Sequence, residues 1–577
     1  MEVPETLRQR VRDHLRTLFP RHGEELIDAV IAAVGVAAAD DGSDRREPWS
    51  ERDAVLISYG DTLLPTSSDE APLVTLRRFV QAHLRDAVSA VHVLPFFPYS
   101  SDDGFSVVDF RAVREDLGSW DDVEALAESC GLMADLVLNH VSSQSVWFEQ
   151  FVADEEPGRS YLRTADPTAD LSAVVRPRTT PLLRPVETAA GIRHLWCTFS
   201  ADQIDLDYRE PKLLCEMLGV VDTYVRRGAR MLRLDAVAYV GKQEGTMCVH
   251  LPQTHELVKL LRTLLEWRAP GTLLVTETNV PNRDNLKYFG QGDEAHLIYN
   301  FSLPPLVIDA LLSGHSRHLS TWMMSMPPAP PGGTYLNFLA SHDGIGIRPA
   351  EGLLSDAEID RLIETVQRSG GLVSWYETPN GPRPYELNVA LRSAFDEPHG
   401  GPDGLGLERF VCAHAIQFAI EGIPAVYVHS FLATPNDLDG VTRTGRARSI
   451  NRSQRSETAV EAALADPTSE TARGLGALTR LLRVRAAQPA FHPSATQFTL
   501  HLGPRLFGCW RQSRDRRQSI FAVSNVTASP ERLEMASLNL ILTDEWFDVL
   551  SGRAVAEECW ELAPYETVWI TNRPAGD

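Results

Sequence analysis

The sequence predicts a (β/α)8 barrel, and three observations lead to this prediction. Short apolar runs of the kind that form buried strands recur along the middle of the chain. Amphipathic stretches such as 256–267 and 413–419 separate several of them, an alternation that is typical of parallel α/β folds. Charged residues come directly after three of the runs, as expected where barrel strands open onto one face. The predicted strands are 55–59, 90–94, 132–138, 230–234, 273–276, 297–299, 335–340 and 423–428.

A helical extension is predicted before the barrel, which is assigned to residues 49–489. Leu7, Val11 and Leu15 recur at helical spacing, and a similar apolar pattern resumes after Pro20. We therefore expect residues 1–48 to form an N-terminal helical extension that packs on the main body.

Two insertions and a C-terminal domain complete the predicted organisation. The stretches 141–215 and 345–408 are too long for simple crossovers and are interpreted as inserted subdomains, the second lying over the mouth of the cleft. Residues 490–577 are predicted to form a β-domain, because the pattern there changes to short strands. These strands are 498–502, 506–510, 520–523 and 567–570.

Composition bounds the class of protein. A net charge of −23 argues against general nucleic-acid binding, which requires a basic footprint. The seven cysteines are scattered and form no Cys-x-x-Cys pair, so neither a disulfide framework nor a zinc site is expected. Glu2, Glu5 and several arginines precede any apolar stretch, and the apolar run 29–39 is too short to span a bilayer. We expect a cytoplasmic protein with no membrane partner.

Three four-residue segments, or tetrads, each lie at the end of an apolar run and contain the candidate catalytic residues. A charge at the end of a buried strand is costly unless it faces a cleft and has partners. Because barrel strand ends meet on one face, these carboxylates should converge there. Glycosyl transfer needs such a set, with one nucleophile, one acid/base and a further negative group near an oxocarbenium-like transition state. The tetrads are Arg233-Leu234-Asp235-Ala236, Thr276-Glu277-Thr278-Asn279 and Ser341-His342-Asp343-Gly344.

Each tetrad also has a structural interpretation. Arg233 and Asp235 point the same way from a strand, so the arginine should lower the pKa of the carboxyl and keep it ionised as a nucleophile requires; the alternative is a structural ion pair. Glu277 should stay protonated beside an apolar wall and other carboxylates; the alternative is a capping or salt-bridging glutamate. Without the other tetrads, His342 and Asp343 would be interpreted as a loop in which the aspartate has a capping role.

Upstream, a glycine-turn loop contains Asp102 and Asp103, and a strand ends in His140. Paired aspartates could bind a metal, but the spacing of a calcium loop is missing. A sugar clamp is favoured, since ionised Asp and neutral His hydrogen-bond hydroxyl groups well.

In chain order, Asn139-His140, Arg233-x-Asp235, Glu277 and His342-Asp343 resemble the four signature segments of the α-amylase family. Longer strings resemble the sucrose phosphorylase branch of that family, over about residues 52–490. These strings are Pro95-Phe96-Phe97-Pro98, Ser101-Asp102-Asp103-Gly104-Phe105, Gln203-Ile204-Asp205-Leu206-Asp207, Arg233-Leu234-Asp235-Ala236-Val237 and Ile450-Asn451-Arg452.

The resemblance implies a role for each carboxylate. Asp235 would be the nucleophile, Glu277 the acid/base and Asp343 the transition-state stabiliser. Phosphate would attack a glucosyl–Asp intermediate to give α-glucose 1-phosphate with retention, with no metal or organic cofactor. The implied glucosyl-site residues are Asp102, Phe105, His140, Phe199, Arg233, His342 and Arg452, with Arg448 a second candidate arginine and Tyr239 a further substrate-binding candidate.

The chain departs from sucrose phosphorylases on the acceptor side. It has Asn279 where they carry a histidine, and an Arg-Pro-Tyr-Glu-Leu-Asn string at 383–388 where they have an Asp-Leu-Tyr-Gln-like one. With the N-terminal extension, these features look like the glucosylglycerate phosphorylases of the same branch.

The acceptor-side residues are then Asn279, Arg383, Tyr385 and Glu386. Arg383 could pair with a glycerate carboxylate or with phosphate, or be a solvated loop arginine. Glu386 would face the glycerate hydroxyls or order Arg383. Arg176 and Arg178 are further candidates for anion binding.

The predicted substrates are glucosylglycerate or a related α-glucoside, phosphate, glucose 1-phosphate and glycerate. Alternatives are sucrose phosphorylase, sucrose 6-phosphate phosphorylase, and an α-glucoside hydrolase or transglucosidase. A non-catalytic amylase-like subunit is disfavoured because Asp235, Glu277 and Asp343 are all kept. The oligomeric state is left open.

Overall fold

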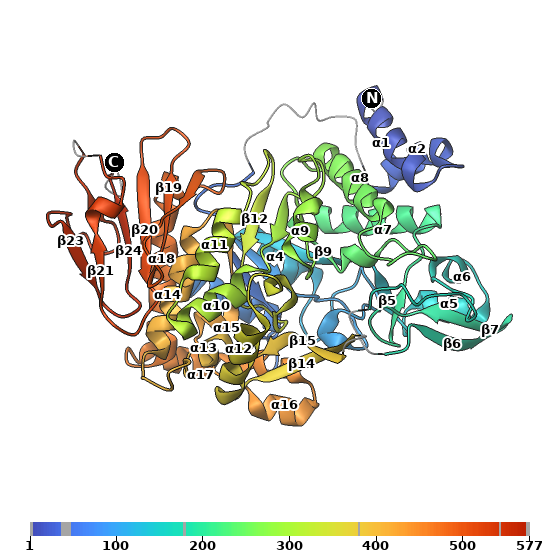
Figure 1. The fold of residues 1–577 in the computed structure, drawn as a ribbon. Helices are drawn as coiled ribbons and strands as arrows, with labels where there is room; N and C mark the ends of the chain where they lie inside the picture. The colour runs from blue at the N-terminus through green and yellow to red at the C-terminus, as the bar shows by residue number, and fades with distance from the viewer. Residues whose placement is uncertain (1–3, 36–47, 177–179, 379–380, 542–543, 573–577) are drawn as a thin grey trace.

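Eight parallel strands close into a barrel, which confirms the predicted fold class (Figure 1). The computed structural model describes residues 4–35, 48–176, 180–378, 381–541 and 544–572. Every predicted barrel strand is present, with ends that shift by up to three residues. The strands are β1 (Val55–Ser58), β3 (Ala90–Val93), β4 (Gly131–Val137), β9 (Ala229–Asp235), β10 (Leu273–Thr276), β11 (Leu297–Tyr299), β12 (Thr334–Asn337) and β16 (Ile423–Tyr427).

The largest shift is at the end of β12, which leaves the ladder at Asn337 rather than at 340. Beyond it the chain is held by a side chain instead of a strand, because the Asn451 amide donates to the carbonyl oxygens of Ser341 and Asp343, both at 3.0 Å. This departure lets the third tetrad turn into the cleft.

The register between neighbouring strands determines how far along the barrel axis each candidate catalytic residue lies. On β4 and β9, Asp135 pairs with Arg233 and Val137 with Asp235. Thr276 on β10 pairs with Leu234, so Glu277 emerges one step beyond the ladder, beside Asp235. The barrel strands are almost entirely buried, which explains why they are continuous apolar runs.

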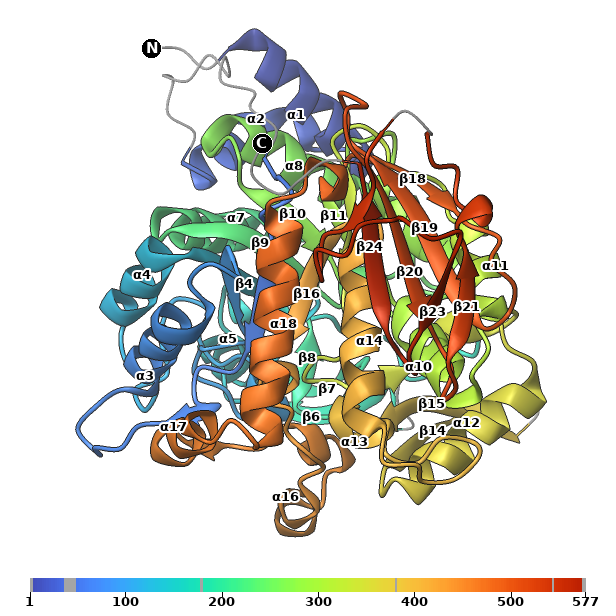
Figure 2. The same cartoon turned by 90° about the vertical axis from the view of Figure 1, so that its left-hand side faces the viewer.

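The N-terminal extension is helical and packs on the outer helices of the barrel (Figure 2). Helix α1 (Glu5–Leu18) contacts α8 (Pro252–Arg268), and α2 (Gly23–Ala33) contacts α7 (Pro211–Arg226). Leu7, Val11 and Leu15 are fully buried. A hydrogen bond of 2.6 Å between His14 Nδ1 and Glu256 adds a polar contact. The amphipathic pattern of the extension therefore exists to cover the barrel helices.

The first insertion follows β4. It contains β5 (His140–Ser142) paired antiparallel with β8 (Gln203–Asp205), and a hairpin of β6 (Leu183–Thr188) and β7 (Gly191–Trp196). Two short helices lie between them, α5 (Val146–Ala153) and α6 (Gly158–Tyr161). The pairing of β5 with β8 brings His140 to the edge of the barrel.

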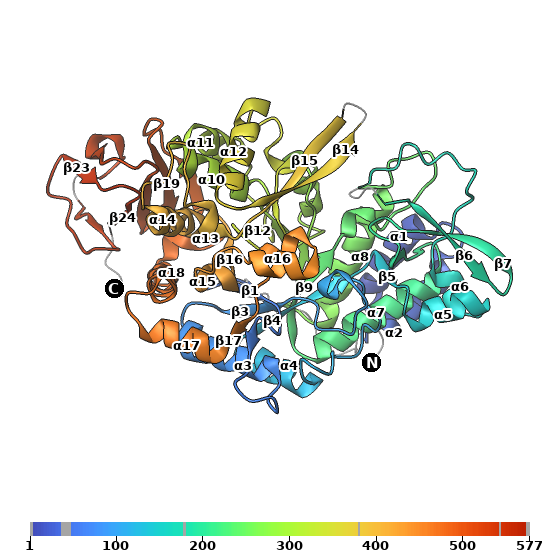
Figure 3. The same ribbon diagram turned by 90° about the horizontal axis from the view of Figure 1, so that it is seen from below.

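The second insertion builds a long hairpin. Strand β13 (Ile345–Gly346) pairs with β15 (Gly381–Asn388), which pairs with β14 (Leu372–Thr378); α12 (Asp356–Arg368) precedes the hairpin. The hairpin projects toward the first insertion (Figures 1 and 3). The two insertions together flank the catalytic face.

The C-terminal part forms a five-stranded sheet beside α14 (Gly406–Ala419) and α18 (Glu470–Ala486) (Figure 2). Its order is β18 (Thr496–Thr499), β19 (Leu506–Gln512), β20 (Ser519–Asn525), β24 (Thr567–Thr571) and β22 (Phe547–Asp548). The sequence analysis did not find β22, β21 (Glu531–Glu534) or β23 (Cys559–Leu562), because these segments are short and strongly polar or interrupted.

Two buried arginines, Arg485 on α18 and Arg511 on β19, tie these elements to the amino-terminal end of the barrel. Arg485 and Arg511 are 1% and 0% exposed, and they donate to main-chain carbonyl oxygens. The acceptors of Arg485 include Gly422, just before β16, and Asp53, just before β1. Arg511 donates to Ala419 at 3.0 Å. Burial lowers the pKa of Arg485 to about 9, which leaves the guanidinium charged at neutral pH.

Candidate active site

A cavity of about 90 Å³ opens at the carboxyl ends of the barrel strands. Its walls come from β9, β10 and the segment after β12, and from both insertions. Fourteen of the residues singled out in the sequence line it, so residues far apart in the chain meet here. They are Asp102, Phe105, His140, Phe199, Arg233, Asp235, Tyr239, Glu277, Asn279, His342, Asp343, Tyr385, Glu386 and Arg448.

Asp235 belongs to a buried ionic network. The Arg233 guanidinium donates to Asp235 Oδ1 at 2.9 Å and, with the same Nη1 atom, to Asp135. Asp135 in turn accepts from His92 Nε2 at 2.8 Å. The Arg233 guanidinium also lies 5.6 Å from the Phe105 ring centroid. Arg233 is therefore immobilised, and its geometry agrees with the predicted orientation toward Asp235.

The expected effect of Arg233 on ionisation was only partly right. Burial raises the pKa of Asp235 well above its usual value, and the charges of Glu277, Asp135 and Asp343 raise it further, while Arg233 acts in the opposite direction. Arg233 thus lowers the pKa of Asp235 as predicted, but a single arginine already paired with Asp135 does not offset burial among several carboxylates.

Glu277 sits directly after β10 and is partly buried. Burial raises the pKa of Glu277, and the charge of Asp343 adds to the shift. Its carboxylate accepts a hydrogen bond of 3.3 Å from the Ala236 main-chain N–H. Ala236 has a φ of 51°, in the left-handed region, so the turn after Asp235 is bent to present this donor.

Asp343 lies in a different environment. Burial alone would raise its pKa, but Arg448, His342, Arg452 and Arg233 together hold the pKa of Asp343 well below its usual range. The Arg448 guanidinium is 2.5 Å from Asp343 Oδ1. This carboxylate is therefore held ionised, whereas burial acts on Glu277 in the opposite direction and raises its pKa.

Glu386 provides the second partner of Arg448. Glu386 is 1% exposed, and its two carboxylate oxygens accept from Arg448 Nε and Nη2 at 2.8 and 2.9 Å. Gly344 permits this approach, since a Cβ there would lie 2.9 Å from the Glu386 carboxyl carbon. The hypothesis that Glu386 orders Arg383 does not hold in this structure, because Glu386 is paired with Arg448 instead.

The loop that carries Asp102 is strained. Asp102 and Asp103 have φ values of 56° and 49°, a conformation that costs a non-glycine residue about 1–3 kcal/mol. Asp103 pairs with Arg446 at 2.8 Å and with Arg452. Asp102 accepts a hydrogen bond of 3.1 Å from Gln203. The strain is thus held by contacts on several sides.

Histidines and aromatic rings form the rest of the wall. His342 stacks on Phe105 with ring centroids 4.9 Å apart, and burial lowers its pKa well below the usual value. His140 donates from Nε2 toward the Phe105 carbonyl oxygen at 2.9 Å, and burial lowers its pKa as well. Phe199 lies 5.2 Å from the His140 ring. Both histidines are neutral hydrogen-bonding groups in this wall.

Three of the predicted arginines that the structure describes do not line the cavity. Arg452 lies one layer behind it, where Nε donates to the His342 carbonyl oxygen at 2.7 Å. The Arg383 side chain is 48% exposed and pairs with Asp356 at 3.4 Å. Arg176 is half-buried elsewhere in the first insertion, and Arg178 lies outside the described residues. The arginine in the cavity wall, besides Arg233, is Arg448.

Some lining residues were not predicted as site residues. Gln203 stands in a string that the sequence already marked, two residues before Asp205, and could have been found there. Phe301 and Phe338 follow barrel strands but carry only the signal of core residues. No group of three or more His, Cys, Asp or Glu side chains within the described ranges is arranged to hold a metal ion.

Comparison with known proteins identifies the family. Residues 85–343 match the model of the α-amylase catalytic domain. A glucosylglycerate phosphorylase from Allomeiothermus silvanus is 42% identical over 98% of this chain and 99% of its own length. The chain belongs to the glucosylglycerate phosphorylase branch of the α-amylase family. A sucrose phosphorylase from Agrobacterium vitis is less similar, with 31% identity over 82% of this chain and 96% of its own.

A solved structure of a related phosphorylase has a similar fold. The crystal structure of sucrose 6F-phosphate phosphorylase from Thermoanaerobacter thermosaccharolyticum superposes with a TM-score of 0.71 and 25% identity, over 82% of this chain and 94% of that one. The resemblance to the α-amylase family and its phosphorylases, read from the motifs, is therefore confirmed.

Proposed function

We propose that this member of the glucosylglycerate phosphorylase branch reversibly phosphorolyses 2-O-α-glucosylglycerate to α-glucose 1-phosphate and glycerate. The observation that carries the proposal is the meeting of Asp235, Glu277 and Asp343 in one cavity, each in its own electrostatic environment. A retaining transfer needs these three roles. The high identity to full-length glucosylglycerate phosphorylases supports the choice of donor.

In the first step the Asp235 carboxylate attacks the anomeric carbon, and the bond from that carbon to the glycerate oxygen breaks. Glu277 gives its proton to this oxygen, so glycerate leaves as a neutral alcohol group. The raised pKa of Glu277 suits this task, because a general acid must be protonated near neutral pH. The product of the step is a glucosyl ester of Asp235.

In the second step a phosphate oxygen attacks the anomeric carbon of the ester and the Asp235 carboxylate leaves. Glu277, now a carboxylate, takes the proton from phosphate. Two inversions at the same carbon give α-glucose 1-phosphate with retention. Asp235 is released as a carboxylate and Glu277 regains a proton from phosphate, so the enzyme is restored without an oxidant or a reductant.

The hydrogen bond of 2.9 Å from Arg233 favours the negative charge on Asp235 rather than on Glu277, for which no such contact to a cation is found among the described residues. Two carboxyls with raised pKa values can share one proton, and Arg233 biases its position toward Glu277. Asp343 stays ionised through Arg448 and lies ready to stabilise the positive charge that develops on the sugar.

The acceptor side is lined by Asn279, Tyr385 and Glu386, with Arg448 behind the glutamate. We propose that Arg448 binds the anionic groups of phosphate and glycerate. It is a cation that lines the cavity and lies next to the acceptor-side residues. A guanidinium matches carboxylate and phosphate in a bidentate manner. Glu386 would then face the glycerate hydroxyls.

The reverse reaction tests the proposal. Glucose 1-phosphate is supplied with glycerate, fructose, fructose 6-phosphate or glycerol, and phosphate release is measured. We expect glycerate to be used fastest. Faster release with fructose or fructose 6-phosphate would assign the protein to the sucrose or sucrose 6-phosphate phosphorylases. Release of glucose alone, with no dependence on phosphate in the forward direction, would make it a hydrolase.

All proposed substrates are small molecules. Within the part of the chain that the structure describes, no helix has the length and apolarity needed to cross a bilayer.

A further inference from the structure

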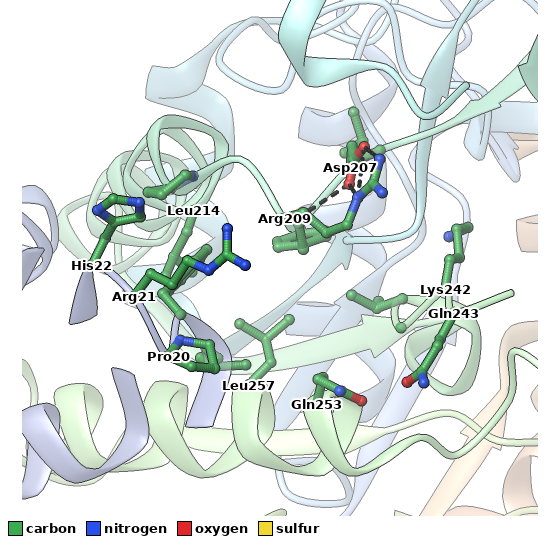
Figure 4. Close-up of a pocket in the computed structure, with 17 residues that line it drawn as sticks. Pro20, Arg21, His22, Asp207, Arg209, Leu214, Lys242, Gln243, Gln253 and Leu257 are labelled. Atoms are coloured by element: carbon green, nitrogen blue, oxygen red, sulfur yellow. Dashed lines mark hydrogen bonds and ion pairs between the residues drawn. The ribbon is translucent and has the colours of Figure 1, made fainter. Parts of the chain in front are cut away.

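A second cavity, of about 440 Å³, lies between the N-terminal extension and the barrel (Figure 4). The turn that joins α1 to α2 forms one wall, with Pro20, Arg21 and His22 at its edge. The starts of α7 and α8 and the segment 240–243 form the others. The volume is within the range of sites that bind small molecules.

The cavity has an apolar body and a positive edge. Leu214 and Leu257 lie on its walls, and the Arg21 guanidinium lies at one edge (Figure 4). No ion pair of Arg21 is found among the described residues, whereas Arg209, at the same edge, is neutralised by Asp207 at 2.6 Å. The uncompensated charge beside the apolar surface is therefore that of Arg21.

One residue links this cavity to the catalytic one. Lys242 lines the second cavity, and its Nζ donates to Asn139 Oδ1 at 2.8 Å and to the Tyr239 carbonyl oxygen at 2.9 Å. Tyr239 lines the catalytic cavity, and Asn139 precedes His140, which also lines it. A molecule that packs on the Lys242 side chain would therefore affect the positions of Tyr239 and Asn139.

We propose that the second cavity binds a small organic anion, with its charged group at Arg21 and an apolar body against Leu214 and Leu257. The charge at the edge selects an anion, and the leucines select a ligand that is not a bare inorganic ion. Its occupancy would be transmitted to the catalytic cavity through Lys242.

An aromatic sulfonate, 8-anilinonaphthalene-1-sulfonate, has this chemistry and reports binding by fluorescence. It is titrated into the full chain with excess glucose 1-phosphate present, which occupies the catalytic cavity. We expect saturable binding with one site per chain. Arg21→Glu should weaken this binding about tenfold or more, since a charge-assisted contact becomes repulsive.

Arg16→Glu is the matched control, because Arg16 is an exposed arginine on α1 that pairs with Glu24 at 3.8 Å and does not line the cavity. Leu214→Trp fills the space and should abolish binding; if that variant does not fold, Arg21→Glu alone decides. Equal binding to wild type, Arg21→Glu and Arg16→Glu, or no binding at all, would overturn the proposal. An unchanged KM for the glucosyl donor in the presence of bound sulfonate would remove the link through Lys242.

Four serine hydroxyl groups converge on one carboxylate beside the strained loop that carries Asp102. One carboxylate, Asp202, accepts hydrogen bonds from Ser100 at 2.6 Å, Ser106 at 2.8 Å, Ser143 at 2.6 Å and also from Ser101. Three of these four serines belong to the loop. Burial would raise the pKa of Asp202, but the serine hydroxyls bring it down to about 2, so the carboxylate is ionised at working pH.

We infer that Asp202 is a positioning residue that holds Asp102 in place for the glucosyl unit. Asp202 does not line the cavity, whereas Asp102 and Phe105 do. The loop between the serines contains Asp102 and Asp103, both in the left-handed region, so it needs an external hold to keep this shape. This inference rests on the proposed glucosyl transfer.

A double-mutant cycle tests the inference. Asp202→Asn keeps the volume of the side chain and loses the charge, and we expect kcat/KM for glucosyl transfer to fall about tenfold. In an Asp102→Ala background the same substitution should cost less than about twofold, because the group that it positions is gone. Asp166→Asn, at a surface aspartate that caps Thr168, is the matched control and should leave kcat/KM unchanged.

A tenfold loss in both backgrounds would show that Asp202 acts through the fold, and no loss in either would show that the loop holds without it. Thermal stability is measured for all four proteins, since a merely structural role would lower Tm equally with and without Asp102. The cycle compares ratios of kcat/KM between variants, measured with whichever acceptor the protein uses. Its result can therefore be interpreted even if glycerate is not the acceptor.

Discussion

The barrel carries buried or half-buried arginines at both ends, and they are satisfied in different ways. At the catalytic end, Arg233 and Arg448 pair with carboxylates. At the amino-terminal end, Arg485 and Arg511 donate to main-chain carbonyl oxygens in the described structure. A carboxylate partner keeps a negative charge available to chemistry, whereas a carbonyl partner only ties chain segments together. Arginines withdrawn from solvent thus support glucosyl transfer at one end and hold chain segments together at the other.

The largest expected effect is at the catalytic end. Asp235→Asn removes the proposed nucleophile, and kcat for phosphorolysis should fall by about 10⁴-fold or more. The Tm should change little, because the amide can still accept a hydrogen bond from Arg233. Rates are measured by the formation of glucose 1-phosphate. Turnover close to normal in a folded variant would refute the role of Asp235.

Glu277→Gln should separate donors by leaving group. With glucosylglycerate the rate should fall about 10²–10⁴-fold, since the leaving oxygen no longer receives a proton. With α-glucosyl fluoride, whose leaving group needs little protonation, the formation of the glucosyl enzyme should lose far less. Equal losses with both donors would contradict the assignment of Glu277 as the acid.

Arg485→Met tests the other end of the barrel. Several carbonyl oxygens lose their donor at once, so the free energy of unfolding should fall by about 3 kcal/mol or more, seen as a lower Tm and denaturant midpoint. The kcat of the folded fraction should not change. Arg480→Met, on the same helix, loses an exposed contact to the Leu550 carbonyl and serves as control. A loss of kcat with unchanged stability would contradict the purely structural role assigned to Arg485 at the amino-terminal end.

Arg448→Met tests the pH dependence. The pKa of Asp343 is low because Arg448 and its neighbours outweigh burial, so without Arg448 this pKa rises. Asp343 must be ionised to act, so the loss of kcat/KM relative to wild type should grow as the pH falls along the acid limb.

The basic limb, set by loss of the Glu277 proton, should not move to lower pH in this variant, since Arg448 lowers the pKa of Glu277 rather than raising it. Profiles between pH 4 and 9 check both limbs. A loss that is the same at every pH would mean that Arg448 does not control the ionisation of Asp343.

The smallest effect is expected at Arg383. Its exposed pairing with Asp356 contributes about 0–1 kcal/mol, so Arg383→Ala should change kcat/KM for glycerate less than about fivefold. The hypothesis from the sequence expects a loss of about tenfold to a hundredfold with glycerate while glycerol is spared. That outcome would show that the hairpin brings Arg383 to the acceptor during the reaction.

Much of this protein could be predicted from the sequence by itself. Buried parallel strands must be apolar on both faces, so all eight barrel strands were visible as continuous runs. Charges are rarely placed at the end of such runs, which made Asp235, Glu277 and Asp343 stand out, and one cavity contains all three. Short-range patterns of this kind survive folding because they depend on each segment alone.

Only the tertiary structure decided the electrostatics and the acceptor side. Whether the pKa of Asp235 rises or falls depends on burial and on every charge around it, and the sequence showed only Arg233. That Glu386 turns inward to Arg448, while Arg383 on the same strand turns outward to Asp356, depends on the pairing of β15 with β13 and β14. Contacts between segments far apart in the chain depend on how those segments pack, and no local pattern carries that information.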